Sequence, residues 1–342
     1  MPWQHIQIAR FGGPEVLELV TEADLPRPGP GEARIKVLAA GTGFTDTFIR
    51  MGRYPDFKGP LPFTPGYELV GVVDALGEGV TAPAVGTMVA DLTVVGGYAQ
   101  YALRPAATLV PVPEGVDPAE AVSLPLAYMT AYQMLTRAAR VEPGARILVI
   151  GASGSVGTAM LDLARAMGLT AIGTCSAHNM GLVESHGAQA IDYASGDFVA
   201  EVRQATAGRG VDAAFDAIGG AHFARSFAAL AFGGVLVGYG SQTMATGGEG
   251  LIAAGLGLAR LKFWTLLSPL FGRRRALWYS ITDHRKAHPD QFAADMATLL
   301  GWLQQGRIRP VVADRLPLSA AADVHRRIAA GGLGGKVVLL PW

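Results

Sequence analysis

The chain has 342 residues, of which 50% are apolar and 16% are charged, and its formal net charge at neutral pH is zero. This composition argues for a compact globular protein and against disorder, and zero net charge gives no general attraction to nucleic acid or to acidic membranes. Its single cysteine, Cys175, excludes an intramolecular disulfide bond. The first residues, MPWQHIQIAR, do not resemble a signal peptide, so we expect a cytoplasmic protein.

The sequence changes character near residue 122, and its length favours two domains. Residues 1–122 read mainly as short strands between Pro- and Gly-rich turns, which predicts a β-rich domain. From 123 to 287 strands alternate with helices, and the strands are expected near 147–150, 170–175, 190–193, 211–217 and 235–239. Right-handed crossovers between such strands give a parallel sheet with helices on both faces.

A strand, a glycine turn and an amphipathic helix follow one another in RILVIGASGSVGTAMLDLARAMGLTAIGTCSAHN, residues 146–179. The glycines Gly151, Gly154 and Gly157 allow a tight turn, close approach of a pyrophosphate and close packing of the helix on the sheet. The first N–H groups of that helix have no internal partner and favour phosphate. The segment therefore predicts a dinucleotide site, and an ordinary strand-to-helix turn is the alternative.

The end of the second strand bears on the choice of nucleotide. An acidic side chain there would bind the ribose hydroxyls of NAD and repel a 2′-phosphate, but this chain has Ser176. We therefore expect NADPH rather than NADH, with its phosphate held by neutral donors because no Arg or Lys follows at once. Helix capping is the alternative role for Ser176 and Asn179. The cofactor-binding candidates in this half of the chain are Gly151, Ser153, Gly154, Ser155, Val156, Gly157, Ser176, Asn179, Tyr193, Gly219, Tyr239 and Gly240.

Residues 251–271 form an apolar run, but Arg260 and Lys262 near its centre oppose a membrane span. We expect a helical excursion from the nucleotide-binding domain. Because it follows a strand whose carboxyl end faces the ligand, residues 249–272 are expected to cover an apolar substrate; packing on the outside of a dimer or on a membrane surface is the alternative. The next segment, 273–281, has the character of an edge strand, which predicts a homodimer with one continuous sheet.

The end of the chain contains a further helix and two strands. The helix is expected over 290–305, and the strands IRPVVADRLPL and GGKVVLLPW are expected to return to the first domain. His284 and His288 have the spacing of a metal pair on a helix. Because Pro289 disfavours helical geometry at the residue before it, we expect exposed loop histidines instead.

Several motifs in order resemble the medium-chain dehydrogenase/reductase superfamily, in its zinc-independent quinone oxidoreductase branch with zeta-crystallin and the VAT-1-like proteins. The motifs are AAGTGFTDTFIRMGRYP, PFTPGYELVGVV, LPLAYMTAYQML, GASGSVG, FDAIGG and GGKVVLLP. The resemblance implies a GroES-like catalytic domain from residues 1–122 and 288–342, a Rossmann domain from 123–287, a nicotinamide in the cleft between them, and usually a homodimer.

Zinc relatives in the superfamily have Cys where this chain has Gly43 and His where it has Tyr67. Neither replacement ligates zinc well, and Cys175 alone cannot supply a structural site, so we expect no metal. Glu68 remains from the motif, and a structural role is expected for it. Without a Lewis acid, substrates that delocalise the arriving charge are favoured, such as quinones and α,β-unsaturated carbonyl compounds.

The catalytic candidates are Tyr54, Tyr67 and Thr130. The two tyrosines are expected to donate a hydrogen bond or a proton to the substrate oxygen, although Tyr also commonly packs as a core residue. Thr130 matches a position that contacts the nicotinamide in relatives, or is simply a residue of its helix. Many quinone oxidoreductases have Asn at Gly43 and several have Tyr at Phe48.

Two functions follow. The first is an NADPH-dependent reductase of quinones or enones, and the second is a nucleotide-binding protein with little turnover, as some relatives in lens or vesicle membranes are. The missing polar groups at Gly43 and Phe48 favour the second function, while the intact glycine turn favours neither.

Overall fold

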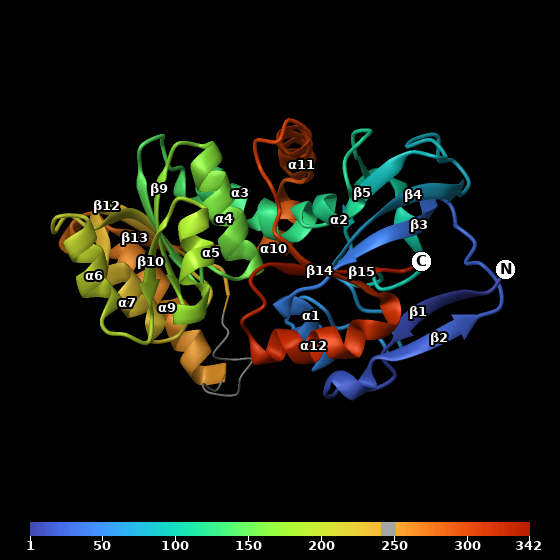
Figure 1. Ribbon diagram of the computed structural model, residues 1–342, viewed down its shortest axis with the longest axis horizontal. Helices are drawn as coiled ribbons and strands as arrows, with labels where there is room; N and C mark the ends of the chain where they lie inside the picture. Colours follow the sequence, from blue (N-terminus) through green and yellow to red (C-terminus); the bar gives the residue numbers. More distant parts are fainter. Residues whose placement is uncertain (241–250) are drawn as a thin grey trace. The chain divides into compact units, whose positions relative to one another are not determined.

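The computed structural model describes residues 1–240 and 251–342, which form two compact units. Residues Met1–Met129 and Asp290–Trp342 make up the first unit, and residues Thr130–Pro289 make up the second (Figure 1). Both ends of the chain belong to the first unit, because strand β15 (Lys336–Leu340) pairs with strand β3 (Glu32–Gly41).

The second unit is built on one parallel sheet with the strand order β10-β9-β8-β11-β12-β13. Its strands are β8 (Arg146–Ile150), β9 (Thr170–Cys175), β10 (Gln189–Asp192), β11 (Val211–Asp216), β12 (Leu230–Gly238) and β13 (Arg275–Trp278). The chain begins in the middle of the sheet, runs outward to β10 and returns to the other side of β8. This is the doubly wound order that binds dinucleotides, so the expected Rossmann sheet is confirmed.

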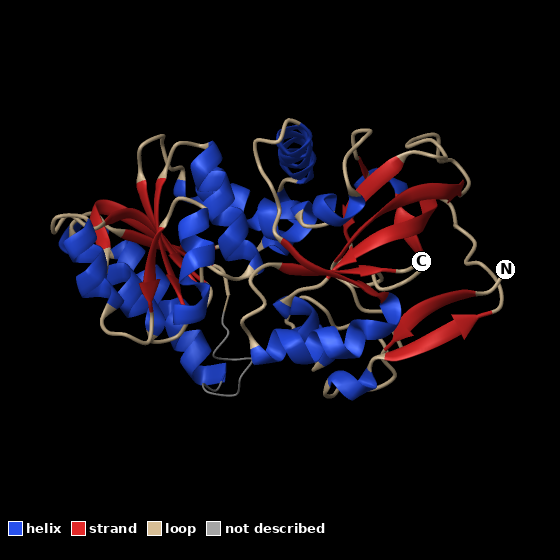
Figure 2. Ribbon diagram, viewed as in Figure 1, coloured by secondary structure: helices blue, strands red, loops and turns tan. Residues whose placement is uncertain are grey.

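Helices cover both faces of this sheet (Figure 2). The central strands are therefore apolar on both sides, and Leu148, Val149 and Leu236 are fully buried. The helical segments of this unit are α3 (Met129–Gln133), η4 (Met134–Ala139), α4 (Ser155–Ala166), η5 (Ala177–Asn179), α5 (Met180–Ser185), α6 (Phe198–Ala205), α7 (His222–Ala228), α9 (Leu251–Leu266), η6 (Ser268–Phe271) and α10 (Ile281–Ala287).

The first unit is built on a largely antiparallel sheet with the strand order β14-β15-β3-β4-β5-β7, in which β6 also pairs with β3. Besides β3 and β15, its strands are β4 (Glu68–Leu76), β5 (Met88–Leu92), β6 (Tyr101–Pro105), β7 (Val110–Pro111) and β14 (Val312–Pro317), with the separate hairpin β1 (Trp3–Gln7) and β2 (Glu18–Glu22). The helical segments are η1 (Pro14–Val16), α1 (Phe44–Arg50), η2 (Ala106–Thr108), α2 (Pro118–Ala121), η3 (Leu124–Tyr128), α11 (Pro289–Gln304), η7 (Leu318–Ala320) and α12 (Ala321–Ala330).

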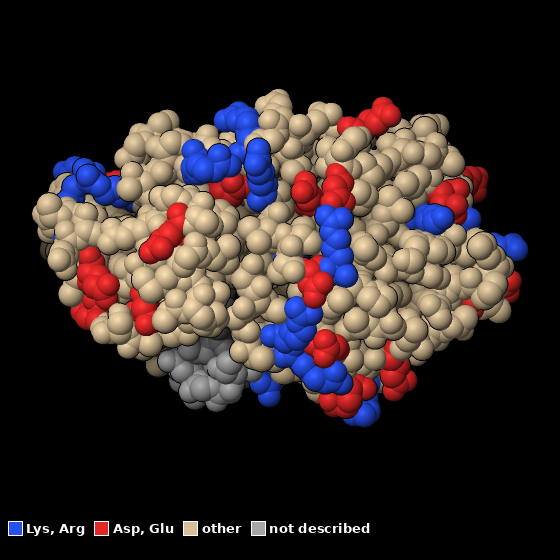
Figure 3. All heavy atoms as spheres, viewed as in Figure 1, with Lys and Arg blue, Asp and Glu red and all other residues tan. Residues whose placement is uncertain are grey.

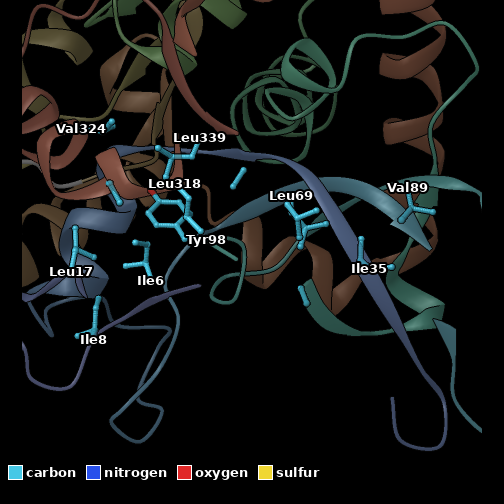
Figure 4. Packing of buried hydrophobic residues seen from close by; sticks show 14 of the residues in the cluster. Ile6, Ile8, Leu17, Ile35, Leu69, Val89, Tyr98, Leu318, Val324 and Leu339 are labelled. Atoms are coloured by element: carbon cyan, nitrogen blue, oxygen red, sulfur yellow. The ribbon is translucent and has the colours of Figure 1, made fainter. Parts of the chain in front are cut away.

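The core of the first unit joins residues from both ends of the chain. Figure 4 shows the Tyr98 ring packed among side chains that include Ile6, Leu318 and Leu339, all of them buried. Burial alternates along β3, so that Ile35 and Val37 face this core. The expected GroES-like, β-rich domain is confirmed, although the sequence pattern missed β6, β7 and the helix α12.

Helix α9 and the segment η6 connect β12 to β13 within the second unit. On the inner side of α9, Leu261 is 2% exposed, the Trp264 ring stacks on Phe227 at 4.3 Å, and Thr265 Oγ1 accepts a hydrogen bond from Ala276 N of β13 at 2.9 Å. The expected helical excursion is therefore present and packs on its own sheet. The beginning of the predicted cover, residues 249 and 250, lies outside the described residues.

The outer side of this connection carries exposed apolar side chains. Leu256, Phe263, Leu266 and Leu270 are between 52% and 78% exposed. Helix α9 contacts β13, which has no neighbour on its outer edge within the sheet of the second unit. Of the helices in residues 1–240 and 251–342, none is both long and apolar enough to span a membrane.

One local expectation was wrong. His284 is not an exposed loop histidine, because it lies on helix α10 and is half-buried. Ser280 begins this helix by accepting a hydrogen bond from Asp283 N at 3.2 Å, and the helix ends at Ala287, so Pro289 excludes only His288 from it. His288 follows the helix and is exposed, as expected.

Candidate active site

The glycine turn joins β8 to α4 in the conformation that a dinucleotide needs. Gly151 has a φ of +72°, which side chains with a Cβ rarely allow. A Cβ on Gly157 would lie 2.7 Å from Ala152 Cα, so only glycine permits the helix to pack this closely on the turn. Bare backbone and the free N–H groups of the first helical turn, which includes Ser155 and Val156, are left for a pyrophosphate. These residues fit the expected cofactor.

A small polar cluster joins this turn to the end of β9. Asn179 Nδ2 donates hydrogen bonds to Ser153 Oγ at 3.1 Å and to Ser176 Oγ at 3.4 Å. Neither Ser176 nor Asn179 makes a side-chain cap bond, so helix capping is not their role here. The Tyr193 side chain follows the neighbouring strand β10 and is 60% exposed. The structure thus brings Ser153, Ser176 and Asn179 together at the place where a ribose is expected.

The ends of β11 and β12 carry the remaining cofactor candidates. Asp216 Oδ1 accepts hydrogen bonds from Ile218 N at 2.8 Å and from Gly219 N at 3.2 Å, which holds the glycine turn after β11. Tyr239 N donates to Asp216 O at 3.1 Å, and a Cβ on Gly240 would lie 2.8 Å from Ala217 O. Gly219, Tyr239 and Gly240 therefore belong to one pair of adjoining loops at the carboxyl edge of the sheet.

The sequence reasoning missed the side chains that hold these loops. The buried Asp216 Oδ2 accepts a hydrogen bond from Ser226 Oγ at 2.6 Å and lies 2.7 Å from His222 Nδ1. His222 and Ser226 are spaced i, i+4 on α7 and follow the acid Asp216 in FDAIGGAHFARS. This pattern is the sequence feature that could have indicated the cluster. Thr130, the remaining candidate of this unit, is 6% exposed on α3.

In the first unit, Tyr67, one of the two positions at which zinc relatives have ligands, forms a hydroxyl pair with Tyr54. Tyr67 is fully buried, and its hydroxyl lies 2.6 Å from that of the half-buried Tyr54. The two rings meet edge to face at 5.8 Å. Burial first, and then Tyr54, raise the pKa of Tyr67 well above its ordinary value, so Tyr67 is a neutral hydroxyl. Gly43, the other position, begins α1.

Behind the tyrosines, Glu68 forms a fully buried ion pair with Lys336. Glu68 Oε2 also accepts a hydrogen bond from Leu126 N at 2.8 Å. Burial raises the pKa of Glu68, and Lys336 opposes that shift. The expected structural role of Glu68 is therefore to pair with Lys336 in GGKVVLLP. The sequence did not indicate this partner, because the two residues are 268 positions apart.

A second buried group lies beside this pair. Asp46 of α1 accepts a hydrogen bond from Gly43 N at 2.8 Å, while its Oδ1 has no hydrogen-bond partner among the described residues. Burial, followed by the nearby Glu68 carboxylate, raises the pKa of Asp46 to about 7, although Lys336 and the Tyr98 hydroxyl act in the opposite direction. The Asp46 carboxyl is therefore partly protonated at neutral pH.

The protonation of His325 follows from its neighbours. Burial and the Arg50 charge lower the pKa of His325 to about 3, so the ring is neutral. Arg50 Nη1 lies 3.2 Å from His325 Nδ1 and can only donate, which leaves the ring proton on Nε2. This nitrogen lies 3.3 Å from the Tyr98 hydroxyl and donates to it. The hydroxyl proton of Tyr98 is then free to face Asp46.

Within residues 1–240 and 251–342, no group of three or more His, Cys, Asp or Glu side chains is placed to hold a metal ion.

Comparison with known proteins relates both halves of the chain to one superfamily. Residues 29–114 match the alcohol dehydrogenase GroES-like domain, and residues 186–339 match a family described as zinc-binding dehydrogenase. The quinone oxidoreductase of Rattus norvegicus is 31% identical over 339 residues, which cover 98% of this chain and 97% of the rat protein. The synaptic vesicle membrane protein VAT-1 homolog of the same species is 32% identical over 347 residues, covering 99% and 84% of the two chains.

A solved structure agrees with these relatives. The quinone oxidoreductase of Escherichia coli, complexed with NADPH, superposes with a TM-score of 0.86 at 26% identity and covers 99% of this chain and 100% of its own.

We expect the substitution Asp46→Asn to change how stability depends on pH. Between about pH 4, where the unfolded carboxyl titrates, and about pH 7, only the folded state holds this proton, so rising pH lowers the free energy of unfolding by about 1.4 kcal/mol per unit. His325 has the opposite sign, because its lowered pKa makes rising pH stabilising between about 3 and 6.5. In urea unfolding, the stability of D46N minus that of the wild type should grow by about 2 to 3 kcal/mol from pH 5 to pH 7.

The variant H325Q provides the control for this measurement, because it removes only the histidine contribution and should make the stability fall more steeply with pH over the same range. A stability difference between D46N and the wild type that does not change with pH would show that Asp46 titrates normally.

We expect the Glu68–Lys336 pair to behave as a buried unit. The single variants E68Q and K336M each leave an uncompensated buried group, and each should lower the free energy of unfolding by about 3 to 5 kcal/mol. The double variant E68Q/K336M leaves no charge and keeps an acceptor for Leu126 N, so it should be more stable than either single variant. Additive losses in a double-mutant cycle would contradict this.

Proposed function

The chain belongs to the zeta-crystallin and VAT-1-like branch of the medium-chain dehydrogenase/reductase superfamily, and from that premise we propose that it is an NADPH-dependent reductase of quinones or α,β-unsaturated carbonyl compounds that works without zinc. The observation that carries this proposal is the hydroxyl pair of Tyr54 and Tyr67, which stands where zinc relatives have a metal ligand. The similarity to quinone oxidoreductases, one of which was solved in complex with NADPH, supports the same function.

The residues at the carboxyl edge of the second unit's sheet would hold the cofactor. The turn with Gly151, Gly154 and Gly157 would take the pyrophosphate, and Ser176, Asn179 and Tyr193 would take the ribose and its 2′-phosphate. Gly219, Tyr239 and Gly240 adjoin that edge, and Thr130 is proposed to contact the nicotinamide. When bound, the reduced nicotinamide supplies a hydride.

The tyrosine pair would supply the oxyanion donor. Tyr54 Oη lies 3.4 Å from Asp56 Oδ2 and 2.6 Å from the Tyr67 hydroxyl, and we propose that Tyr54 donates to Asp56 while Tyr67 donates to Tyr54. In this arrangement the fully buried Tyr67 donates its hydroxyl proton to Tyr54. The half-buried Tyr54 can then rotate its hydroxyl and donate to a substrate oxygen. We therefore assign the donor role to Tyr54 and a positioning role to Tyr67, which polarises Tyr54 through the shared bond.

The absence of zinc in this proposal limits the substrates. Hydride addition to a quinone or an enone gives a hydroquinone anion or an enolate, whose charge is spread over several atoms, and a tyrosine or water proton completes the reaction. A simple ketone gives a localised alkoxide, which needs a stronger Lewis acid. Gly43 has no side chain and Tyr67 has only a phenol, so neither position offers an ordinary zinc ligand.

A second function is favoured by two residues at which relatives have polar side chains. Gly43 offers no polar group, and Phe48 packs edge to face on Phe44 at 5.1 Å. With these groups missing, a nucleotide-binding protein with little turnover, similar to the VAT-1 homologue, is the alternative. NADPH binding without NADPH oxidation across a panel of quinones and enones would decide for it.

The surface supports a small-molecule substrate and a second copy of the chain as partners. Positive and negative side chains adjoin one another on the face shown in Figure 3, for example around α12, where Arg326 and Arg327 pair with Asp323 and Asp314. The face shown in Figure 3 therefore has no strongly basic region of the kind that binds nucleic acid. The unpaired edge of β13 and the exposed apolar side of α9 and η6 support a homodimer, and the predicted location of the protein remains the cytoplasm.

We expect Y54F to lower kcat/KM about 100-fold with an enone, because the enolate loses its donor. The loss should be smaller with a quinone, whose anion is less basic. Y67F should lower kcat/KM about tenfold, because Tyr54 remains but is no longer polarised. NADPH affinity should not change in either variant, and Y101F serves as a control at a tyrosine outside the site. Equal activity of Y54F and the wild type on enones would remove Tyr54 from the mechanism.

We expect the purified protein to contain no stoichiometric zinc, because Gly43 and Tyr67 cannot act as ligands of an ordinary catalytic site. Elemental analysis should find much less than one zinc per chain, and treatment with a chelator should leave the rate of quinone reduction and the melting temperature unchanged. One tightly bound zinc per chain, lost together with activity, would contradict the proposed chemistry.

We expect light scattering at micromolar concentration to give twice the chain mass of 35.6 kDa. The variant L266E places a charge on the exposed apolar side of α9 and should give monomers. L19E makes the same change at an exposed leucine of β2 and should remain dimeric. A monomeric wild type would count against the paired sheet edge.

A further inference from the structure

The part of the chain that would surround a 2′-phosphate is short of cations. Residues 166–202 contain no arginine or lysine, although they include the ends of both β9 and β10. The acids Glu184 and Asp192 lie close enough to β9 that, after burial, they raise the pKa of the Cys175 thiol directly before the turn. The local field therefore opposes a phosphate dianion unless a positive charge offsets it.

Two histidines are the basic side chains of this stretch, and their positions differ. His178 is exposed in the turn after β9, and its Nε2 lies 3.5 Å from Ser176 Oγ. Ser176 Oγ accepts from Asn179 Nδ2, which also reaches Ser153 of the glycine turn. His186 follows α5, and its Nδ1 lies 2.9 Å from Leu182 O of the same helix. Of the two, His178 alone shares the cluster at which a ribose is expected.

We propose that His178, as an imidazolium acting with the Ser176 hydroxyl that Asn179 holds in place, is the residue through which this chain recognises the 2′-phosphate of NADPH. The inference rests on the proposed use of NADPH and replaces the expectation that neutral donors alone hold the phosphate. A charged donor forms a stronger hydrogen bond to phosphate than a hydroxyl or an amide does. Because the ring is exposed, its attraction is partly screened by salt.

The consequence is a cofactor preference that depends on pH. Histidine changes its charge between pH 5 and 8, whereas a phosphate monoester stays mainly dianionic above about pH 6. The titratable groups on the elements around the turn are Glu184 of α5, Asp192 and Tyr193 at the end of β10, and the mutually paired Asp162 and Arg165 of α4. NADH lacks the phosphate, so its affinity measures every other effect of pH on the same site.

The test is the ratio of the Kd for NADH to the Kd for NADPH, measured by cofactor fluorescence without substrate at pH 6.5 and pH 8.5. In the wild type this ratio should fall about three- to tenfold as the pH rises. In H178Q it should be low at both pH values, and in H178K it should remain high at both. H186Q, at the other histidine of the segment, should behave as the wild type does.

Each outcome decides the inference. A wild-type ratio that favours NADPH equally at both pH values, or an H178Q ratio that follows the wild type, would overturn it. Unchanged NADH affinity in H178Q shows that the site is intact, and H178K gives an independent gain at pH 8.5. Because no quinone is present, failure of this inference is distinct from failure of the proposed reductase activity, which would appear as NADPH binding without turnover.

Discussion

The buried ion pair between Glu68 and Lys336 connects parts of the chain that are far apart in sequence. Glu68 begins β4 and lies opposite Gly41 of β3, while Lys336 begins β15, which pairs with β3. A Cβ on Gly41 would collide with the Glu68 side chain, so glycine leaves the room that the carboxylate occupies. Both charges are out of water, and each is tolerable only because the other is present. The pair thereby fixes the ends of three strands around which Gly43, Asp46 and Tyr67 are arranged.

That arrangement explains how a polar interior is satisfied by side chains of the protein itself. Asp46, Tyr98, His325 and Arg50 form a buried series whose protons are ordered by the one member that can only donate, Arg50. The neutral His325 and the partly protonated Asp46 reduce the number of buried charges to those of Arg50 and the ion pair. In the proposed reaction, the tyrosine hydroxyls would add neutral donors, which suit an oxyanion that is already delocalised better than a localised alkoxide.

The sequence predicts what depends on local pattern. The apolar strands, Gly151 with its left-handed φ and the close packing at Gly157 all follow from residues that are near one another in the chain. Lys336 and His325 could not be placed, because their partners Glu68 and Arg50 are 268 and 275 residues away. The error at His284 arose because Pro289 restricts only the residue before it, while the Ser280 cap starts a helix one turn earlier. The lack of Arg and Lys in residues 166–202 predicts neutral donors for the phosphate, whereas a histidine there can carry a charge that depends on pH.

Helix α9 has the apolar composition of a membrane span but packs on the sheet of the second unit. It is apolar around most of its circumference, so packing Leu261 and Trp264 on the sheet satisfies only one side. The opposite side keeps Leu256, Phe263 and Leu266 exposed, and β13, which α9 contacts, has no strand partner on its outer edge. Thr265 of α9 already bonds both backbone groups of Ala276 in this strand, so part of the strand edge is satisfied within the chain. Addition of a symmetry-related copy would cover the apolar face and give the rest of β13 a partner, whereas a substrate cover would only cover the apolar side chains, so the proposed dimer accounts for more of this surface.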